Sequence, residues 1–243
     1  MWIGALALLA FVLFLLARFP AAWAVGALPP GLSCDSIDGT LWSGTCGGLM
    51  LRHQQLLGDL AWQLKPARLL LGRLAAHAEL TQAADFVNVD LEVSPGGHID
   101  ARNVHASVHL SPTLLPQLPP GLRGVARAEL THIEVTRGRL ADLRGTIEAH
   151  DLAQTGGTTT ELGNYALSFA GAGGGAAIVG ELHDLGGPLD LHGSLRVTAD
   201  PGFVLEGTVA ARPTASPNLV RQLQMLGAPD AQGRRSFSLA NTF

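Results

Sequence analysis

The sequence is poor in the features that nucleic-acid binding and zinc coordination require. Its 243 residues carry 16 Lys and Arg against 20 Asp and Glu, so the formal net charge of −4 provides no basic field for phosphates. One Tyr and eight Phe leave few rings on which bases could stack. The two cysteines have neither a Cys-X-X-Cys spacing nor a neighbouring His, which zinc sites usually show. We therefore expect no nucleic-acid partner and no metal ion.

Signatures of catalysis are missing as well. The chain has no G-x-S-x-G, no Walker A loop and no pair of acids at the head of a helix. His105 and His109 have the spacing of a helical zinc pair, but on a strand they would lie about 13 Å apart. Residues 171–176 match G-x-G-x-x-A, yet the segment that follows is too short and β-rich for the helix of a dinucleotide site. We predict no catalytic, metal-binding or cofactor-binding residues, and no enzyme.

What the sequence does contain is a repeated five-residue pattern. Its first and fifth positions are aliphatic, its second is any residue, its third is Gly, and its fourth is either Thr or Ser. It occurs at residues 37–41, 143–147, 191–195 and 205–209. On a strand the two aliphatic residues and the Gly share one face, because side chains alternate with a period of two. Gly inside a strand marks a bulge, a bend or a close approach of two backbones. The pattern predicts a sheet that curves.

Alternation with a period of two continues along the chain, interrupted by Gly and Pro turns. Strands are predicted within 32–51 and at 56–64, 69–80, 86–93, 99–110, 123–136, 139–151, 160–170, 176–183, 189–199, 203–211 and 234–239. The connections are too short for parallel crossovers, so neighbours should be antiparallel. Only residues 217–226 have helical spacing. We predict an all-β fold, a curved antiparallel sheet with one short C-terminal helix.

Three arrangements of that sheet stay open: two half-sheets, a groove, or a partly open barrel. The Pro-rich segment 111–121 is too rich in proline for a strand and is the best candidate for a boundary inside the β domain.

The N-terminus carries an unbroken apolar run over residues 2–17, followed by Arg18. As a helix this run would rise about 24 Å, slightly short of a hydrocarbon core of about 30 Å. A cleavable signal peptide usually carries Lys or Arg before its apolar run, and none is present here. We predict a membrane-anchor helix over residues 1–28 that contacts the bilayer through residues 2–19, with a β domain over 29–243. Arg18 alone leaves the orientation open.

The two cysteines, Cys34 and Cys46, lie close together just beyond this segment. In an oxidising compartment a disulfide between them would stabilise the domain by roughly 3 kcal/mol. A two-residue turn at Asp38-Gly39 would place Cys34 opposite Ser43, so the bridge requires a bulge or a longer loop. Two free buried thiols are the alternative.

The segment between the cysteines, Gly39-Thr40-Leu41-Trp42-Ser43-Gly44, mixes large and small residues on both faces of a strand. Such a strand would place Trp42 and Gly44 on the same face. We expect Trp42 to pack inward beside Gly39 and Gly44, and both Trp42 and Trp62 to have structural roles. An exposed docking surface is the alternative for the two indoles.

Several segments resemble the protein N family of the bacterial type II (general) secretion system. They are Leu28-Pro29-Pro30-Gly31, the segment 39–44 (GTLWSG), Trp62-Gln63-Leu64-Lys65-Pro66, Leu69-Leu70-Leu71-Gly72-Arg73-Leu74, and Leu226-Gly227-Ala228-Pro229-Asp230 with Gly233-Arg234. The resemblance covers essentially the whole chain, and the GTLWSG segment after a single apolar run is its most specific part. Residues 39–44, Trp62 and Pro66 are family motif residues to which we assign structural roles.

The resemblance implies a non-enzymatic accessory component of an apparatus that exports folded proteins across the outer membrane. It implies a location at the bacterial inner membrane, with the bulk of the chain in the periplasm and other type II secretion components as partners. A membrane-tethered β-groove that binds or transfers lipid is the alternative. The two hypotheses differ in whether the apolar face of the sheet is covered.

Overall fold

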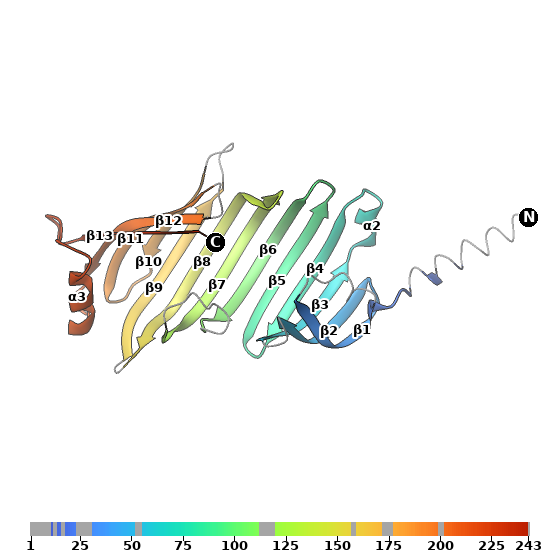
Figure 1. The fold of residues 1–243 in the computed structure, drawn as a ribbon, viewed down its shortest axis with the longest axis horizontal. Helices are drawn as coiled ribbons and strands as arrows, with labels where there is room; N and C mark the ends of the chain where they lie inside the picture. The colour runs from blue at the N-terminus through green and yellow to red at the C-terminus, as the bar shows by residue number, and fades with distance from the viewer. Residues whose placement is uncertain are drawn as a thin grey trace, which may run out of the picture. The chain divides into compact units, whose positions relative to one another are not determined.

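The structure is a computed structural model that describes residues 11, 14–15, 18–22, 31–51, 55–111, 120–156, 159–171, 177–198 and 202–242. These residues form thirteen strands and two short helices (Figure 1). The chain divides into two compact units, residues 1–95 and 96–243. The boundary predicted near 111–121 falls inside the second unit, and most of that segment lies outside the described residues.

The first unit contains five strands in chain order, each antiparallel to the next. They are β1 (Leu32–Gly39), β2 (Ser43–Leu51), β3 (Gln55–Leu64), β4 (Leu74–Gln82) and β5 (Asp85–Ser94), with helix α2 (Pro66–Leu69) between β3 and β4. The strand predicted at 69–80 therefore begins later, at Leu74. Pro66 starts a helical turn because its ring fixes a helical φ at a position that needs no N–H donor. Gly72, with φ +70°, then ends the turn.

The second unit contains eight strands, again in chain order and antiparallel. They are β6 (His98–His109), β7 (Leu122–Thr136), β8 (Arg139–Thr155), β9 (Thr159–Ala170), β10 (Ile178–Asp184), β11 (Leu189–Thr198), β12 (Gly202–Ala211) and β13 (Arg235–Thr242), with helix α3 (Pro217–Gln224) before β13. The all-β antiparallel prediction is confirmed. Among the described residues neither unit closes into a barrel, so the sheet is open.

The repeated glycines sit where two backbones approach closely. A Cβ at Gly145 would lie 2.2 Å from the carbonyl oxygen of Glu129, and its φ is +129°. The β7–β8 ladder shifts register beside it, between Leu130 and His132. At Gly207 a Cβ would lie 2.4 Å from the carbonyl oxygen of His192. The prediction that these glycines mark bulges or close approaches is confirmed at both positions.

The apolar face of the second unit buries a central cluster of Leu130, Leu143, Phe169 and Ile178, which are only 4–8% exposed. The aromatic ring of Phe169 lies over Gly180, where a Cβ would be 2.6 Å from the ring. A large side chain thus fills the space that a glycine on the neighbouring strand leaves. The centre of this face is buried by the strands' own side chains.

Helix α3 covers a second apolar cluster in the same unit. Leu219 and Leu223 of the helix pack with Leu189 and Val209 of the sheet. The helix begins where Ser216 Oγ accepts a hydrogen bond from the Leu219 N–H at 3.3 Å. The predicted C-terminal helix is confirmed, two residues shorter than expected. Coverage by α3, together with the buried central cluster, does not support an open lipid groove.

The predicted anchor helix over residues 1–28 lies mostly outside the described residues. Of its described part, Phe19 accepts a hydrogen bond through its carbonyl oxygen from the Leu41 N–H at 2.8 Å, and Pro20 forms a bridge with Thr40. In the portion of the chain that the structure describes, no helix is long and apolar enough to span a membrane. The anchor therefore stays a prediction.

Candidate functional site at the N-terminal hairpin

The family motif residues 39–44 comprise the end of β1, the loop 40–42 and the start of β2. Gly39 and Gly44 face each other across the hairpin, and Thr40 Oγ1 accepts a hydrogen bond from the Ser43 N–H at 3.2 Å. Gly39 has φ +95°, and a Cβ there would lie 2.5 Å from the Ser43 carbonyl oxygen. Only glycine fits this position without strain. The loop is longer than the two-residue turn considered at Asp38-Gly39.

Trp62 of β3 joins this loop to the second motif segment. A Cβ at Gly44 would lie 2.5 Å from Trp62 Cζ2, so the indole occupies the space above the glycine. Trp62 Nε1 donates a hydrogen bond to the Leu41 carbonyl oxygen at 3.1 Å, and the Leu64 N–H donates to the Trp42 carbonyl oxygen at 2.7 Å. Two segments about twenty residues apart in sequence thus form one interlocked structure.

This arrangement corrects the expectation that Trp42 and Gly44 share a strand face. The indole beside Gly44 is that of Trp62, while Trp42 lies half-buried in the loop between the two strands. The prediction assumed that strand alternation continues through residues 39–44. The loop at Thr40 to Trp42 breaks that alternation, so Trp42 and Gly44 do not share a strand face.

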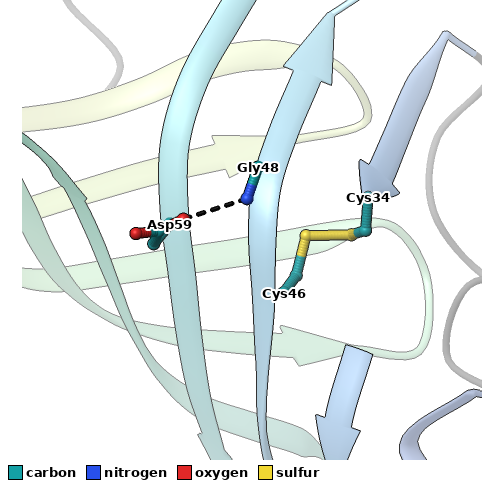
Figure 2. Close-up of a disulfide and its surroundings, with 4 residues drawn as sticks. All are labelled: Cys34, Cys46, Gly48 and Asp59. Carbon is teal, nitrogen blue, oxygen red and sulfur yellow. Dashed lines mark hydrogen bonds between the residues drawn. A yellow bond between two sulfur atoms is a disulfide. The ribbon is translucent and has the colours of Figure 1, made fainter. Parts of the chain in front are cut away.

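A disulfide joins Cys34 of β1 to Cys46 of β2, with their Cα atoms 5.6 Å apart (Figure 2). The regular ladder pairs Cys34 with Leu49 instead, and β2 bulges between Cys46 and Leu49. Gly48, with φ +63°, lies in this bulge and donates its N–H to Asp59 Oδ1 at 2.9 Å. Both a longer loop and a bulge are therefore present, which are the irregularities that the bridge was expected to require.

Comparison with known proteins identifies the family. The chain matches the family "Type II secretion system (T2SS), protein N" over residues 30–238. It belongs to that family. Its relative "Type II secretion system protein N" of Aeromonas hydrophila is 27% identical over 243 residues, covering 96% of this chain and 94% of the relative. No solved structure matches the chain. The resemblance is confirmed, and membership of the T2SS protein N family supports a role in type II protein secretion.

The C-terminal motif of this T2SS protein N chain builds the turn that leads into β13. Asp230 Oδ1 accepts hydrogen bonds from the N–H groups of Gln232 at 2.9 Å and Arg234 at 2.8 Å. Arg234 in turn donates through Nη2 to Asp190 Oδ2 of β11 at 2.9 Å. Gly227 accepts a hydrogen bond from Arg235. These contacts give the motif a structural role, which is to position the last strand.

Within the described part of the chain, the side chains of Asp184, Asp190 and His192 come close enough to hold a metal ion, with ligand atoms within 4.8 Å of one another. Arg212 Nη1 lies 2.7 Å from Asp184 Oδ1, and Arg234 neutralises Asp190. A cation would have to displace two guanidinium groups. The carboxylates of Asp184 and Asp190 therefore belong to an ion-pair network with the two arginines. The arginines are too far from them in sequence for the network to appear as a motif.

The contacts of this network set the protonation states of Asp184, Arg212 and Tyr165. Burial raises the pKa of Asp184, but hydrogen bonds from Arg212 and from the N–H groups of Leu191 and Gly186 outweigh it, so the net pKa is lowered. The hydrogen bond to Asp184 raises the pKa of Arg212. Burial raises the pKa of Tyr165 to about 12. Asp184 and Arg212 are thus charged together at neutral pH.

A second network crosses β6, β7 and β8 on the polar face. His132 Nε2 lies 2.8 Å from Asp100 Oδ1, and His132 Nδ1 lies 3.1 Å from Asp142 Oδ2. Arg144 Nε donates to Asp142 Oδ2 at 2.8 Å. Burial raises the pKa of Asp100, and hydrogen bonds from Arg102 and His132 lower it by more. No local sequence pattern indicates this network, because Asp100 and Asp142 lie on the strands to either side of His132.

The histidines first considered as a metal pair, His105 and His109, both lie exposed on β6. Beside the hairpin, a shallow hollow of about 480 Å³ is lined in part by Gly44, Trp62 and His77. His77 Nδ1 lies 3.2 Å from Asp90 Oδ1, which also pairs with Lys65. These contacts place His77 in a surface ion-pair network.

Proposed function

We propose that the chain is a non-enzymatic assembly component of the type II secretion apparatus. In this proposal it is held at the bacterial inner membrane by residues 1–28, with residues 29–243 in the periplasm. Membership of the T2SS protein N family over residues 30–238 is the observation that carries it. The Cys34–Cys46 bridge supports an oxidising compartment such as the periplasm.

An assembly role is also supported by what the motif residues do. Gly39, Thr40 and Gly44 shape a loop, Trp62 fills the space beside it, and Asp230 forms a turn. Each contact is structural and none of them prepares a nucleophile or a proton acceptor for a substrate.

Strand β13 is the part of the second unit best suited to a partner. In the described residues it pairs with β12 alone, so its other edge presents unpaired backbone groups, and Leu239 is 55% exposed. Such an edge can accept an extended segment of another chain as an additional strand. We take an extended segment of another secretion component as the occupant, since the family is that of a multi-component apparatus.

The decisive experiment deletes the gene in a bacterium that encodes this chain and secretes type II substrates. We expect substrates to accumulate in the periplasm, and inner-membrane components of the apparatus to decrease in immunoblots. A plasmid carrying the wild-type gene should restore both. Normal secretion with unchanged component levels would overturn the proposal.

The partner edge is tested separately with a photo-crosslinking amino acid at Ser238, an exposed residue of β13, in the complemented strain. A matched probe at Ser168, which lies inside the sheet between β8 and β10, serves as the control. Crosslinks to another secretion component from residue 238, and none from residue 168, would support binding of a partner at the β13 edge. Crosslinks to a second copy of the chain would replace that partner with self-association.

A further inference from the structure

We propose that Leu69, Leu70 and Leu71 insert into the interfacial layer of the membrane. These three residues, here called the leucine tip, occupy the end of α2 and the turn that follows it. Their exposed fractions are 41%, 90% and 70%, so the tip presents three consecutive leucines to its surroundings. Single exposed apolar residues are common on soluble proteins, whereas a contiguous apolar protrusion marks an interaction site.

The tip is held in this position by a regular set of backbone hydrogen bonds. The Arg68 N–H donates to the Lys65 carbonyl oxygen at 3.0 Å, and the Leu71 N–H donates to that of Arg68 at 3.0 Å. The Gly72 N–H donates to the Leu69 carbonyl oxygen at 2.9 Å. Because the turn is satisfied internally, the exposure of the leucines is a property of the folded turn.

Basic side chains surround the leucine tip. Lys65 pairs with Asp90 at 3.2 Å, and both Arg68 and Arg73 reach Glu92, at 3.8 and 2.9 Å. All three basic side chains are about half exposed, so they can also meet phosphate groups. Three cations against two carboxylates leave the flank positive. Apolar residues flanked by Lys and Arg are typical of segments that lie at an anionic lipid surface.

The leucine tip and Phe19 lie at the same end of the sheet in the first unit. Phe19, which follows the run, hydrogen-bonds to Leu41 in the β1–β2 loop. The next residue of that loop, Trp42, hydrogen-bonds to Leu64 at the end of β3. Helix α2 begins two residues after Leu64. With two strand spacings of about 5 Å each, Phe19 lies about 10 Å to the side of Leu64, and the tip begins five residues after Leu64.

A bilayer that holds residues 2–17 would therefore face the leucine tip. This step rests on the membrane location proposed above. The contact would fix the first unit at a second point, so that the sheet could not swing freely about its N-terminal connection. A lipid surface explains both the apolar tip and its basic flank, whereas an apolar protein partner would explain only the leucines.

The test uses the full chain reconstituted into vesicles of phosphatidylethanolamine and phosphatidylglycerol. Both native cysteines are joined in the bridge, so Leu70→Cys introduces the one free thiol, to which an environment-sensitive NBD dye is attached. Ala84→Cys is the matched control, because Ala84 lies exposed in the turn between β4 and β5, at the opposite end of the same sheet. Vesicle flotation shows that the chain is membrane-bound.

We expect a blue shift of the dye at position 70, and loss of its emission when lipids carry a shallow nitroxide quencher. The dye at position 84 should show neither change. Equal signals at both positions in floated vesicles would contradict membrane insertion of the leucine tip. The proposed membrane location of the chain would be unaffected. A chain that does not float would overturn both.

Two further experiments distinguish insertion into lipid from contact with another protein. A change at position 70 that disappears when the protein-to-lipid ratio is lowered would mean contact with a second copy, and would overturn the lipid contact. Leu70→Glu should abolish quenching of a dye placed at Leu71→Cys and leave the melting temperature in detergent unchanged, because both side chains are exposed. Quenching that survives Leu70→Glu would also count against insertion.

Discussion

Beyond their backbone ladders to β2 and β12, the two terminal strands of the chain are held by different means. In the first unit, β1 is joined to β2 by the Cys34–Cys46 bridge. In the second unit, β13 is held by hydrogen bonds of its preceding turn and by the pair between Arg234 and Asp190. One attachment is covalent, whereas the other consists of hydrogen bonds and one ion pair.

The size of the apolar core explains why the two units differ. The described residues of the first unit bury few apolar side chains in its strands, namely Cys46, Leu49 and Ala75. The second unit buries two clusters, one of them under α3. A unit with a small core gains most from a disulfide, because the bridge lowers the entropy of the unfolded chain. Where few apolar side chains are buried, an open sheet gains from a specific stabilising contact such as a disulfide.

The largest effect is expected from Trp62→Ala. This change removes the indole over Gly44 and its hydrogen bond to Leu41, and truncation of a buried Trp costs about 3–5 kcal/mol of unfolding free energy. Because Trp62 is half-buried, we expect the lower end of that range. Urea unfolding followed by fluorescence measures it.

Trp42→Ala is the control for that measurement, since Trp42 lies in the loop. Its loss of stability should be clearly smaller. An equal loss in the two variants would contradict the assignment of Trp62 as the residue that holds the hairpin.

Removal of the disulfide is expected to have the next largest effect. Cys34→Ser with Cys46→Ser should lower the unfolding free energy of the first unit by about 3 kcal/mol. Hydrogen exchange followed by mass spectrometry should show loss of protection in β1 and β2 and no change in α3. Equal loss of protection in both units would mean that the bridge stabilises more than its own hairpin.

A third prediction removes one arginine from the ion-pair network of Asp184 and Asp190 in the second unit. Arg212→Gln leaves the buried carboxylate of Asp184, whose side chain is 6% exposed, without its charged partner. Loss of this charge-assisted hydrogen bond should lower the unfolding free energy by less than removal of the disulfide does. Protection should fall in β10 to β12 and stay unchanged in the disulfide hairpin. Arg196→Gln, an exposed position on β11, is the control and should have little effect.

The smallest effect is the acid dependence of the second unit. The pKa of Asp184 and that of Asp100 are lowered in the folded state. Each therefore contributes stability above the unfolded-state value of about 3.9, and loses it as pH falls through the lower folded value. Urea midpoints should fall as pH is lowered from 6 through the unfolded-state value of about 3.9 and below it.

Asp184→Asn should show a weaker decline over the same range, because its amide does not titrate. Arg212 and Tyr165, which face Asp184, keep their charge states there, since their pKa values are raised. An unchanged pH profile in this variant would show that Asp184 is not a source of the acid sensitivity.

Most elements of the fold were predictable because their signals are local. Alternation with a period of two located most strands to within a few residues, and the helical spacing of residues 217–226 located α3. Helix α2 was missed because four residues are too few to show a helical period. The leucines beside it were assigned to a strand, and their exposure depends on the turn that Pro66 starts.

The sequence by itself determined the antiparallel class, the order of the strands, the apolar N-terminal run and the family, since composition, periodicity and motifs are properties of neighbouring residues. Only the tertiary structure decided that Trp62 rather than Trp42 lies over Gly44, because that contact depends on strand register. It also decided that Asp184 meets Arg212. The register of two paired strands depends on the length of the loop between them and on every bulge within them. One extra residue in the loop therefore changes which residues face each other across the two strands.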